Sequence, residues 1–481
     1  MLWPWGSCQC QPVITILIRG RAKVTQTAIV GATLIDGNGG EPIRDAVVLF
    51  EGDRFVAAGS REGSTLPENI TQVDAAGKFL IPGIINANVH LLDGWTFMIG
   101  TGTVEYLARF EGRLHEVIEE AAQIALANGM TTVFDTYNAL QPVLFARDRI
   151  ASGKALGARI YAAGNIVGMG GPFSADFSKK ARETTSQTFC DRMDAMFEAG
   201  VGRRLAALPP EEVRLIIRDY LSKGVDLLKF AVSDHILLEY MNPHLTFSAR
   251  VQRVIAEEAW AAGKPLLSHT TSLESLNDAV TLGVDAMMHT SLTAGVPIPD
   301  DIIEQIIRKT VWAEIQPVND EYQHHLETTG GMMAGYAGGV HRENIQRLIA
   351  AGAPILLGTD AGCTDPDCLA DMSEGDRHDR PWSIGGDHFH WFRAMRQLGM
   401  KPMDMLQAAT KNIARAYKKE ADLGTVEAGK YADFLILDAN PIDDEDNYKR
   451  IHAIYQGGRL VDRSALPVKR LVTQYPRFEP S

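Results

Sequence analysis

Short apolar runs alternate with longer amphipathic segments through the middle of the chain, from about residue 84 to residue 419. The segments between the runs, such as residues 114–129 and 302–309, carry apolar residues at helical spacing. Eight strand–helix units of this kind predict a (β/α)8 TIM barrel, which places the chain in the α/β class. The runs with the length of buried strands are residues 83–92 (GIINANVHLL), 131–138 (TTVFDTYN), 158–165 (ARIYAAGN), 225–233 (VDLLKFAVS), 264–271 (KPLLSHTT), 286–291 (AMMHTS), 311–318 (VWAEIQPV) and 353–362 (APILLGTDAG).

Both ends of the chain have a different texture, with β-rich runs that are separated by glycine turns. Residues 45–60 (DAVVLFEGDRFVAAGS) predict a hairpin around Glu51-Gly52-Asp53, and residues 451–461 (IHAIYQGGRLV) are again strand-like. A doubly wound open sheet competes with the barrel, but no Gly-x-Gly-x-x-Gly sequence follows the first barrel strand. We therefore expect a barrel over residues 81–419, a small composite β-sandwich domain from residues 25–80 and 420–470, and an N-terminal extension over residues 1–24.

Charge and cysteine content narrow the partners and the compartment. The 47 Lys and Arg against 60 Asp and Glu give a net charge of −13, which provides no long-range attraction to nucleic acid or to an anionic membrane. Five cysteines are too few, and odd in number, for a disulfide scaffold, and they indicate a reducing, cytoplasmic compartment. Residues 13–18 are apolar, but a secretory signal core needs about 7–15 such residues with positive charge before it.

Polar side chains lie at the carboxyl ends of several predicted strands, where (β/α)8 barrels place their active sites. Each has an ordinary alternative, since a strand-end histidine can be structural, a buried lysine can pair with a carboxylate, and an aspartate after Gly-Thr can cap a helix. Their occurrence together at one barrel mouth favours a shared function. The candidates are Asn86, Asn88, His90, Lys229, His269, His289 and Asp360.

Imidazole and carboxylate groups in this combination indicate a divalent metal site. Side chains alternate along a strand, so Asn88 and His90 face the barrel mouth together. A buried ammonium group is costly, and carbamylation would turn the Lys229 amine into an anionic oxygen ligand. The expected metal ligands are His90, Lys229, His269, His289 and Asp360, with Asn88 as a weaker donor.

These residues resemble the amidohydrolase superfamily, with a likeness that extends from about Ala28 to Val461. Residues 74–91 (DAAGKFLIPGIINANVHL) are similar to its strand-1 signature, which ordinarily reads Pro-Gly, two apolar residues, Asp, any residue, His, any residue, His. Residues 410–441 are similar to its closing motif, where the chain re-enters the β domain. The resemblance implies a metal-dependent hydrolase, in which the carboxylated lysine, the two later histidines and the catalytic aspartate correspond to Lys229, His269, His289 and Asp360.

The chain departs from this signature in the first strand. Asn88 stands in the place of the family's first histidine, and Asn86 stands in the place of the preceding aspartate. An amide oxygen is a poorer ligand than imidazole for a borderline metal. We therefore expect one divalent ion (Zn, Co, Fe or Mn) per subunit, or a harder and more labile ion at the strand-1 position. The Asn-x-His pattern resembles a subgroup that contains the phenylurea hydrolases and molinate hydrolase, which cleave synthetic ureas and thiocarbamates.

This resemblance implies herbicide degradation by hydrolysis of the C–N bond of neutral ureas or carbamates, most of all N-aryl ureas that release an aniline. Asp360 would accept the proton of the attacking water and return it to the departing nitrogen, with Lys229 as the second catalytic residue. No cluster of basic residues lies at the strand ends to bind a substrate carboxylate, which favours a neutral substrate over a peptide. The candidate substrate contacts are Trp95, Phe173, Tyr240 and Asn319.

Three hypotheses remain open on the sequence alone. The first is a metal-dependent hydrolase of neutral urea, carbamate or amide bonds, with a thiocarbamate hydrolase as its alternative. The second is a dipeptidase or cyclic-amide hydrolase on the same barrel. The third is a non-catalytic scaffold, motivated by Asn86 and Asn88 and opposed by the retention of the other candidates. Analogy with related barrel enzymes suggests a homo-oligomer that acts on a small molecule.

Overall fold

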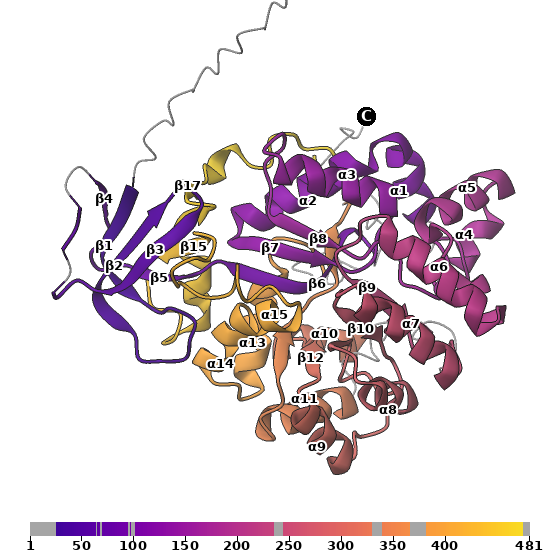
Figure 1. Ribbon diagram of the computed structural model, residues 1–481. Coiled ribbons are helices and arrows are strands. Elements are labelled where there is room, and N and C mark those ends of the chain that lie inside the picture. Colours follow the sequence, from indigo (N-terminus) through magenta and orange to yellow (C-terminus); the bar gives the residue numbers. More distant parts are fainter. Residues whose placement is uncertain are drawn as a thin grey trace, which may run out of the picture.

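The computed structural model describes residues 26–63, 65–67, 70–94, 97, 102–234, 244–329, 339–365 and 381–474. Figure 1 shows a barrel ringed by helices and, beside it, a smaller body of strands coloured indigo and yellow, which come from the two ends of the chain. The arrangement confirms the predicted TIM barrel with an additional β domain.

Eight parallel strands form the barrel. Hydrogen bonds divide them into a segment from β6 to β8 and a segment from β9 to β13. The two segments meet where Val167 N–H donates to Lys229 O at 2.9 Å and where Thr359 N–H donates to Asn88 O at 3.0 Å. The strands are β6 (Ile84–Leu92), β7 (Met130–Asp135), β8 (Arg159–Ala162), β9 (Leu228–Ala231), β10 (Leu266–His269), β11 (Ala286–Met288), β12 (Trp312–Ile315) and β13 (Ile355–Leu357).

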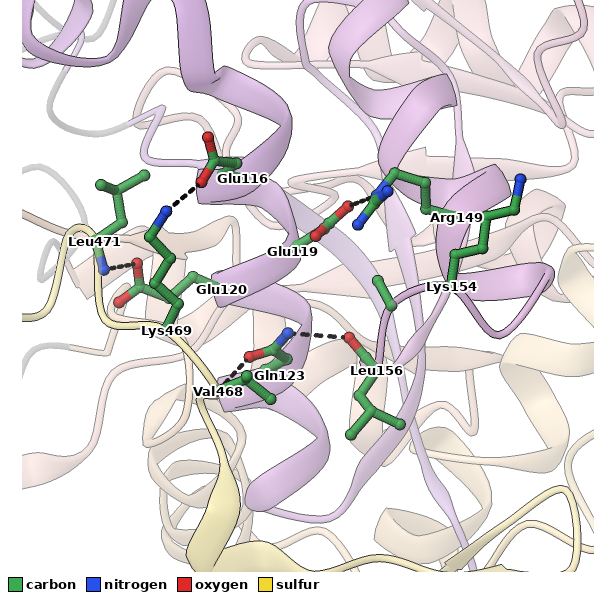
Figure 2. A pocket seen from close by; sticks show the side chains of 11 residues that line it. Glu116, Glu119, Glu120, Gln123, Arg149, Lys154, Leu156, Val468, Lys469 and Leu471 are labelled. Carbon is green, nitrogen blue, oxygen red and sulfur yellow. Dashed lines mark hydrogen bonds and ion pairs between the residues drawn. The ribbon is translucent and has the colours of Figure 1, made fainter.

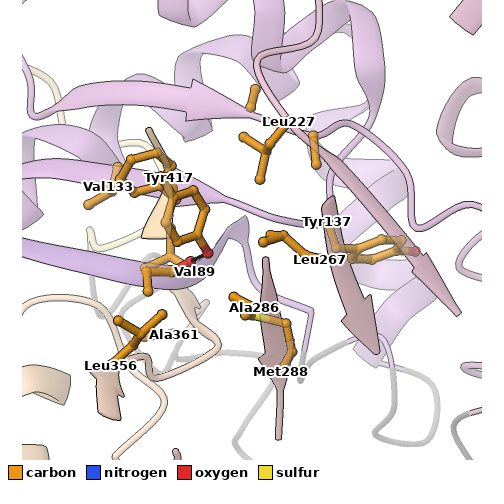
Figure 3. Close-up of a cluster of buried hydrophobic side chains, with 14 of the residues drawn as sticks. Val89, Val133, Tyr137, Leu227, Leu267, Ala286, Met288, Leu356, Ala361 and Tyr417 are labelled. Atoms are coloured by element: carbon orange, nitrogen blue, oxygen red, sulfur yellow. Dashed lines mark hydrogen bonds between the residues drawn. The ribbon is translucent and has the colours of Figure 1, made fainter. Parts of the chain in front are cut away.

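The barrel strands are short apolar runs because both of their faces are covered. Every residue of β6, β9, β10, β11, β12 and β13 is buried. Figure 3 shows Val89, Val133, Leu267 and Met288 gathered in the interior from four different strands. Layered apolar side chains of this kind fill the barrel, so polar groups are left to the strand ends.

Helices follow the strands and cover the outside of the barrel (Figure 1). Their apolar positions at helical spacing face the strands, as in α2, where Val117, Ile118 and Ala121 are buried. The helices are α1 (Gly102–Phe110), α2 (Leu114–Ala127), α3 (Leu140–Ala151), α4 (Lys179–Glu183), α5 (Gln187–Glu198), α6 (Pro210–Ser222), α7 (Ala249–Ala261), α8 (Leu273–Leu282), α9 (Asp300–Lys309), α10 (Asp320–Thr329), α11 (Gly339–Ala350), α13 (Asp387–Gln397), α14 (Pro402–Ala408) and α15 (Lys411–Ala416).

The composite β domain is one hydrogen-bonded sheet of eight strands. Antiparallel pairing of β15 with β5 joins the C-terminal strands to the N-terminal ones, and the predicted hairpin pairs Glu51 with Arg54. The rings of Phe434 and Tyr455 stack inside it, and the Phe50 ring lies tilted to the first and edge-on to the second. Its strands are β1 (Gln26–Leu34), β2 (Ile43–Glu51), β3 (Arg54–Ser60), β4 (Thr71–Asp74), β5 (Phe79–Pro82), β15 (Phe434–Leu437), β16 (Ile451–Gln456) and β17 (Arg459–Leu460).

One further short strand, β14 (Ala361–Cys363), follows the last barrel strand and pairs with β6. Within the described ranges, no helix has the length and apolar character that crossing a membrane would require.

Candidate active site

The carboxyl ends of five barrel strands bring the predicted site residues to one end of the barrel. Asn88 and His90 lie on β6, Lys229 on β9 and His269 at the end of β10. His289 directly follows β11, and Asp360 lies between β13 and β14. None of the six is more than 5% exposed, so the site is built from side chains withdrawn from bulk solvent.

Asp360 lies between two of the histidines. Its Oδ1 is 3.4 Å from His90 Nε2, and its Oδ2 is 3.6 Å from His289 Nδ1. The His289 ring in turn lies edge-on to the His269 ring, with centroids 4.9 Å apart. The strand-end residues therefore form one connected group, from β6 through β13 to β11 and β10.

These donors suit a divalent cation by type and by spacing. Both separations from Asp360 exceed a hydrogen bond, and both approach the about 3.4 Å that separates two ligand atoms of a tetrahedral ion with bonds of about 2.1 Å. Asp360 Oδ1 accepts no hydrogen bond from any described residue. Across the described ranges, however, no three His, Cys, Asp or Glu side chains already converge on one point. The fit is therefore one of donor chemistry and of pairwise distance.

Lys229 and Asn88 share a hydroxyl group. Lys229 Nζ donates to Thr136 Oγ1 at 3.0 Å, and the Thr136 hydroxyl donates to Asn88 Oδ1. Burial lowers the pKa of Lys229, against the opposing influence of the nearby carboxyl groups of Asp360, Glu314 and Asp135. The amide oxygen of Asn88 thus already accepts a hydrogen bond, and its weakness as a metal ligand stays a prediction.

Two buried carboxyl groups stand beside the site although the sequence analysis did not single them out. Burial raises the pKa of Asp135, at the end of β7, to about 7. Burial, together with the neighbouring Asp360, raises the pKa of Glu314, on β12, to about 8. Both residues lie in runs that were predicted as strands, so the strand-end rule that selected His269 could also have selected them, together with Thr136.

Two residues of this site, His289 and Asp360, have strained backbone conformations. His289 and Asp360 have φ values of 58° and 53°, in the left-handed region that non-glycine residues rarely adopt. Glu314 stabilises the first of these turns, since its Oε2 accepts the His289 N–H at 2.7 Å. The Asp360 N–H is bonded to Asn88 O at 2.8 Å. Hydrogen bonds from neighbouring strands therefore hold two site residues in conformations that their own chain segments disfavour.

Two of the predicted substrate contacts fall within the described residues and two fall outside them. Trp95 and Tyr240 lie outside them. Phe173 is buried against Phe189 of α5, and Asn319 accepts the Tyr322 N–H at 2.8 Å at the start of α10. Neither observation links Phe173 or Asn319 to the histidines, and their role in substrate binding stays a prediction.

Comparisons with known proteins identify the family of the chain. A family model described as "Amidohydrolase family" matches residues 79–461, so the chain belongs to the amidohydrolase family.

Within that family, the chain is 51% identical to a solved structure of molinate hydrolase, with a TM-score of 0.92 and coverage of 95% of this chain and 99% of the other. It is 52% identical to phenylurea hydrolase B, with a TM-score of 0.91 and coverage of 94% and 100%. An imidazolonepropionase from Fusobacterium nucleatum is 23% identical over 435 residues, which are 86% of this chain and 91% of that protein. The predicted superfamily and subgroup are therefore confirmed.

Proposed function

We propose that this chain is a metal-dependent hydrolase of neutral ureas and carbamates, with N-aryl ureas as its preferred substrates and an aniline as the product. The observation that carries the proposal is the position of Asp360, within 3.4 Å of His90 and 3.6 Å of His289. Similarity to molinate hydrolase and phenylurea hydrolase B over more than nine tenths of the chain supports the substrate class.

The residues present suit one divalent ion, which we assign to Zn, Co, Fe or Mn. When bound, such an ion polarises a carbonyl group and lowers the pKa of a coordinated water from 15.7 toward about 7. Asn88 would be the weakest donor, because Thr136 already holds its oxygen. The ligands in this proposal are His90, His269, His289, Asp360 and carboxylated Lys229.

Burial of Lys229 prepares it for carboxylation. Its lowered pKa favours the neutral amine, whose lone pair can form an N–C bond to carbon dioxide with loss of one proton. The product is an anionic carbamate on a side chain that would otherwise be a buried cation. Thr136, bonded to Nζ at 3.0 Å, orients this nitrogen.

Asp360 moves the proton in the proposed reaction. One of its carboxylate oxygens accepts a proton from the water that attacks the urea carbon, and the same proton is returned to the departing nitrogen. The C–N bond breaks to give an aniline and a carbamic acid, which decomposes to an amine and carbon dioxide. An aniline leaves more easily than a dialkylamine, because the ring delocalises its nitrogen lone pair.

A thiocarbamate hydrolase is the second candidate, and the 51% identity to molinate hydrolase favours it specifically. The attack on the carbonyl carbon is the same, and a thiolate departs in place of an aniline. Under either substrate class the partner is a small neutral molecule. A homo-oligomer in the cytoplasm stays a prediction.

The test combines metal analysis with a substrate panel. Purified protein is expected to contain one divalent ion per chain and to release aniline from N-aryl ureas or a thiol from thiocarbamates. Removal of the ion by a chelator should abolish turnover, and one of Zn, Co, Fe or Mn should restore it. Full activity after complete metal removal would contradict the proposal, and cleavage of dipeptides in place of ureas would correct the substrate class.

Two matched variants locate the proton transfer. Asp360→Asn should lower kcat by about 10²–10⁴-fold, since an amide cannot accept the proton. Asp438→Asn makes the same chemical change in the β domain, where Asp438 pairs with Lys78, and should leave kcat unchanged. Equal effects of the two substitutions would exclude Asp360 as the base.

A further inference from the structure

Three buried polar side chains meet next to the site, on the side of Asp360 where the chain enters from β13. They are Asn86 on β6, Thr359 immediately before Asp360, and Asp387 at the start of α13. Asn86 Nδ2 donates to Thr359 Oγ1 at 2.8 Å and to Asp387 Oδ2 at 3.1 Å. The Thr359 hydroxyl donates to the same Asp387 oxygen at 2.8 Å, which closes a triangle of hydrogen bonds.

This triangle is connected to the two strands that carry the candidate chemistry. Asn86 Oδ1 accepts the Asn88 N–H at 3.1 Å. Asn88 O in turn accepts the N–H groups of Thr359 and Asp360, at 3.0 Å and 2.8 Å. The left-handed turn at Asp360 is therefore fixed on its main chain by Asn88 and on the preceding side chain by Asp387.

The chemistry at position 86 matches the chemistry at position 387. The Asn86 amide uses its oxygen for a backbone donor and its nitrogen for the Asp387 carboxylate. An aspartate at position 86 would place a second carboxylate oxygen about 3 Å from Asp387, and two buried carboxylates at that distance cannot both ionise. Asp387 also accepts the Gly385 N–H at 2.9 Å. The position of Asp387 in the first turn of α13 favours a negative charge there.

We propose that Asn86, Thr359 and Asp387 form a positioning triad that holds Asp360 in place, and that the amide at 86 and the carboxylate at 387 are a matched pair. This inference explains why an asparagine occupies the strand-1 position where the family signature has an aspartate. Its effect on turnover rests on the proposed function, whereas its effect on the position of Asp360 does not.

An exchange of the two groups tests the pairing. Asn86→Asp and Asp387→Asn are made singly and together, because the double variant again places one amide against one carboxylate. Deuterium exchange at the Thr359 and Asp360 amides, followed on a peptide that spans residues 355–363, is the first readout and needs neither substrate nor metal. Each single variant should exchange at least tenfold faster there than the parent, and the double variant should recover most of the protection.

Turnover is the second readout. Each single variant should lose at least tenfold in kcat with little change in KM, because Asp360 would be misplaced while substrate binding is retained. The kcat of the double variant should be at least tenfold higher than the value obtained by multiplying the two single losses. Additive losses in both readouts would overturn the triad. If the double variant recovered the protection from deuterium exchange but the parent hydrolysed no urea or thiocarbamate, the triad would stand and the proposed function would be refuted.

A second pair of variants keeps the test decisive if the exchanged proteins fold poorly. Thr359→Val removes the hydroxyl that donates to Asp387 and retains the side-chain shape, whereas Thr359→Ser retains the hydroxyl. The valine variant should show the fast deuterium exchange and the lowered kcat, and the serine variant should stay within about threefold of the parent. The same result for valine and serine would show that this hydroxyl does not position Asp360.

Discussion

At the scale of single residues, the hydroxyl group of Thr136 is hydrogen-bonded to both Asn88 and Lys229 and orients their side chains. Thr136 accepts from Lys229 Nζ at 3.0 Å and donates to the Asn88 amide oxygen. A histidine at position 88 would have a stronger metal-binding nitrogen, but it would compete with Lys229 for Thr136. A histidine at position 88 would therefore raise the metal affinity at β6 and disturb the orientation of Lys229.

We therefore expect Asn88→His to strengthen metal binding at the strand-1 position without raising kcat. Metal content by mass spectrometry and affinity by competition with a chromophoric chelator would measure the change. Asn277→His, at an exposed position on α8, is the matched control and should leave both quantities unchanged. An unaltered stoichiometry and affinity in Asn88→His would show that residue 88 does not lie near the metal.

Most residues of the candidate site could be selected one by one from the sequence, but the hydrogen bonds that support them could not. His90, Lys229, His269, His289 and Asp360 could be selected because each ends an apolar run. Thr136, Asp135 and Glu314 end predicted strands and could have been selected by the same rule, but no local pattern encodes their hydrogen bonds to other strands. For the same reason Asn86 was a candidate from the sequence, whereas its hydrogen bonds to Thr359 and Asp387 were not predictable.

At the scale of elements, the apolar periodicity predicted eight strands because each is buried on both faces. It could not predict which helix forms side-chain hydrogen bonds to which strand end. One such contact is made by the buried His341 on α11, whose Nε2–H donates to Gln316 O, just beyond β12, at 3.3 Å. Burial lowers the pKa of this imidazole from 6.5 to about 4, so the folded protein holds it neutral.

This shift makes stability depend on pH in a defined direction. Between about pH 6.5 and pH 4, His341 is protonated in the unfolded chain but stays neutral in the folded one. The free energy of unfolding therefore falls as the pH falls. The contribution amounts to about 3 kcal/mol across that window. His341→Gln, which retains a donor for Gln316 O, should flatten this part of the profile.

Urea unfolding at a series of pH values would measure this effect. His324→Gln, at an exposed position on α10, is the control and should follow the parent profile. If His341→Gln lost stability with falling pH as steeply as the parent does, another group would be responsible for the acid sensitivity.

At the scale of the whole molecule, the chain passes from barrel to β domain and then returns to the barrel. The strand-like ends predicted the composite β domain, but nothing in the pattern of residues 466–474 predicts their position along α2. Figure 2 shows this C-terminal segment lying against α2. A pocket of about 270 Å³ lies between them and α3 residues such as Arg149. Because α2 packs on β6 and β7, this contact joins the end of the chain to the wall of the barrel that carries Asn88 and His90.

One buried carboxylate binds residues 471–473 of that segment. Glu120 is 2% exposed, and its Oε2 accepts the N–H groups of Leu471 and Val472 at 2.7 and 2.8 Å. Its Oε1 accepts both the N–H and the hydroxyl of Thr473, at 3.0 and 2.6 Å. Hydrogen bonds to a charged acceptor contribute about 1.5–3 kcal/mol each, and loss of the acceptor leaves buried N–H groups without a partner.

We therefore expect Glu120→Gln to lower the free energy of unfolding by about 2–4 kcal/mol, because the amide nitrogen would turn a donor toward backbone donors. Trypsin should then cut after Lys469 or Arg470 in the variant while the parent resists. Glu116→Gln is the control on the same helix, where the ion pair with Lys469 is largely exposed and contributes at most about 1 kcal/mol. Equal stability losses for the two variants would mean that exposed ion pairs, and not the buried carboxylate, hold the C-terminal segment. Trypsin sensitivity would then increase with ionic strength, since salt screening weakens the exposed pair far more than the buried contact.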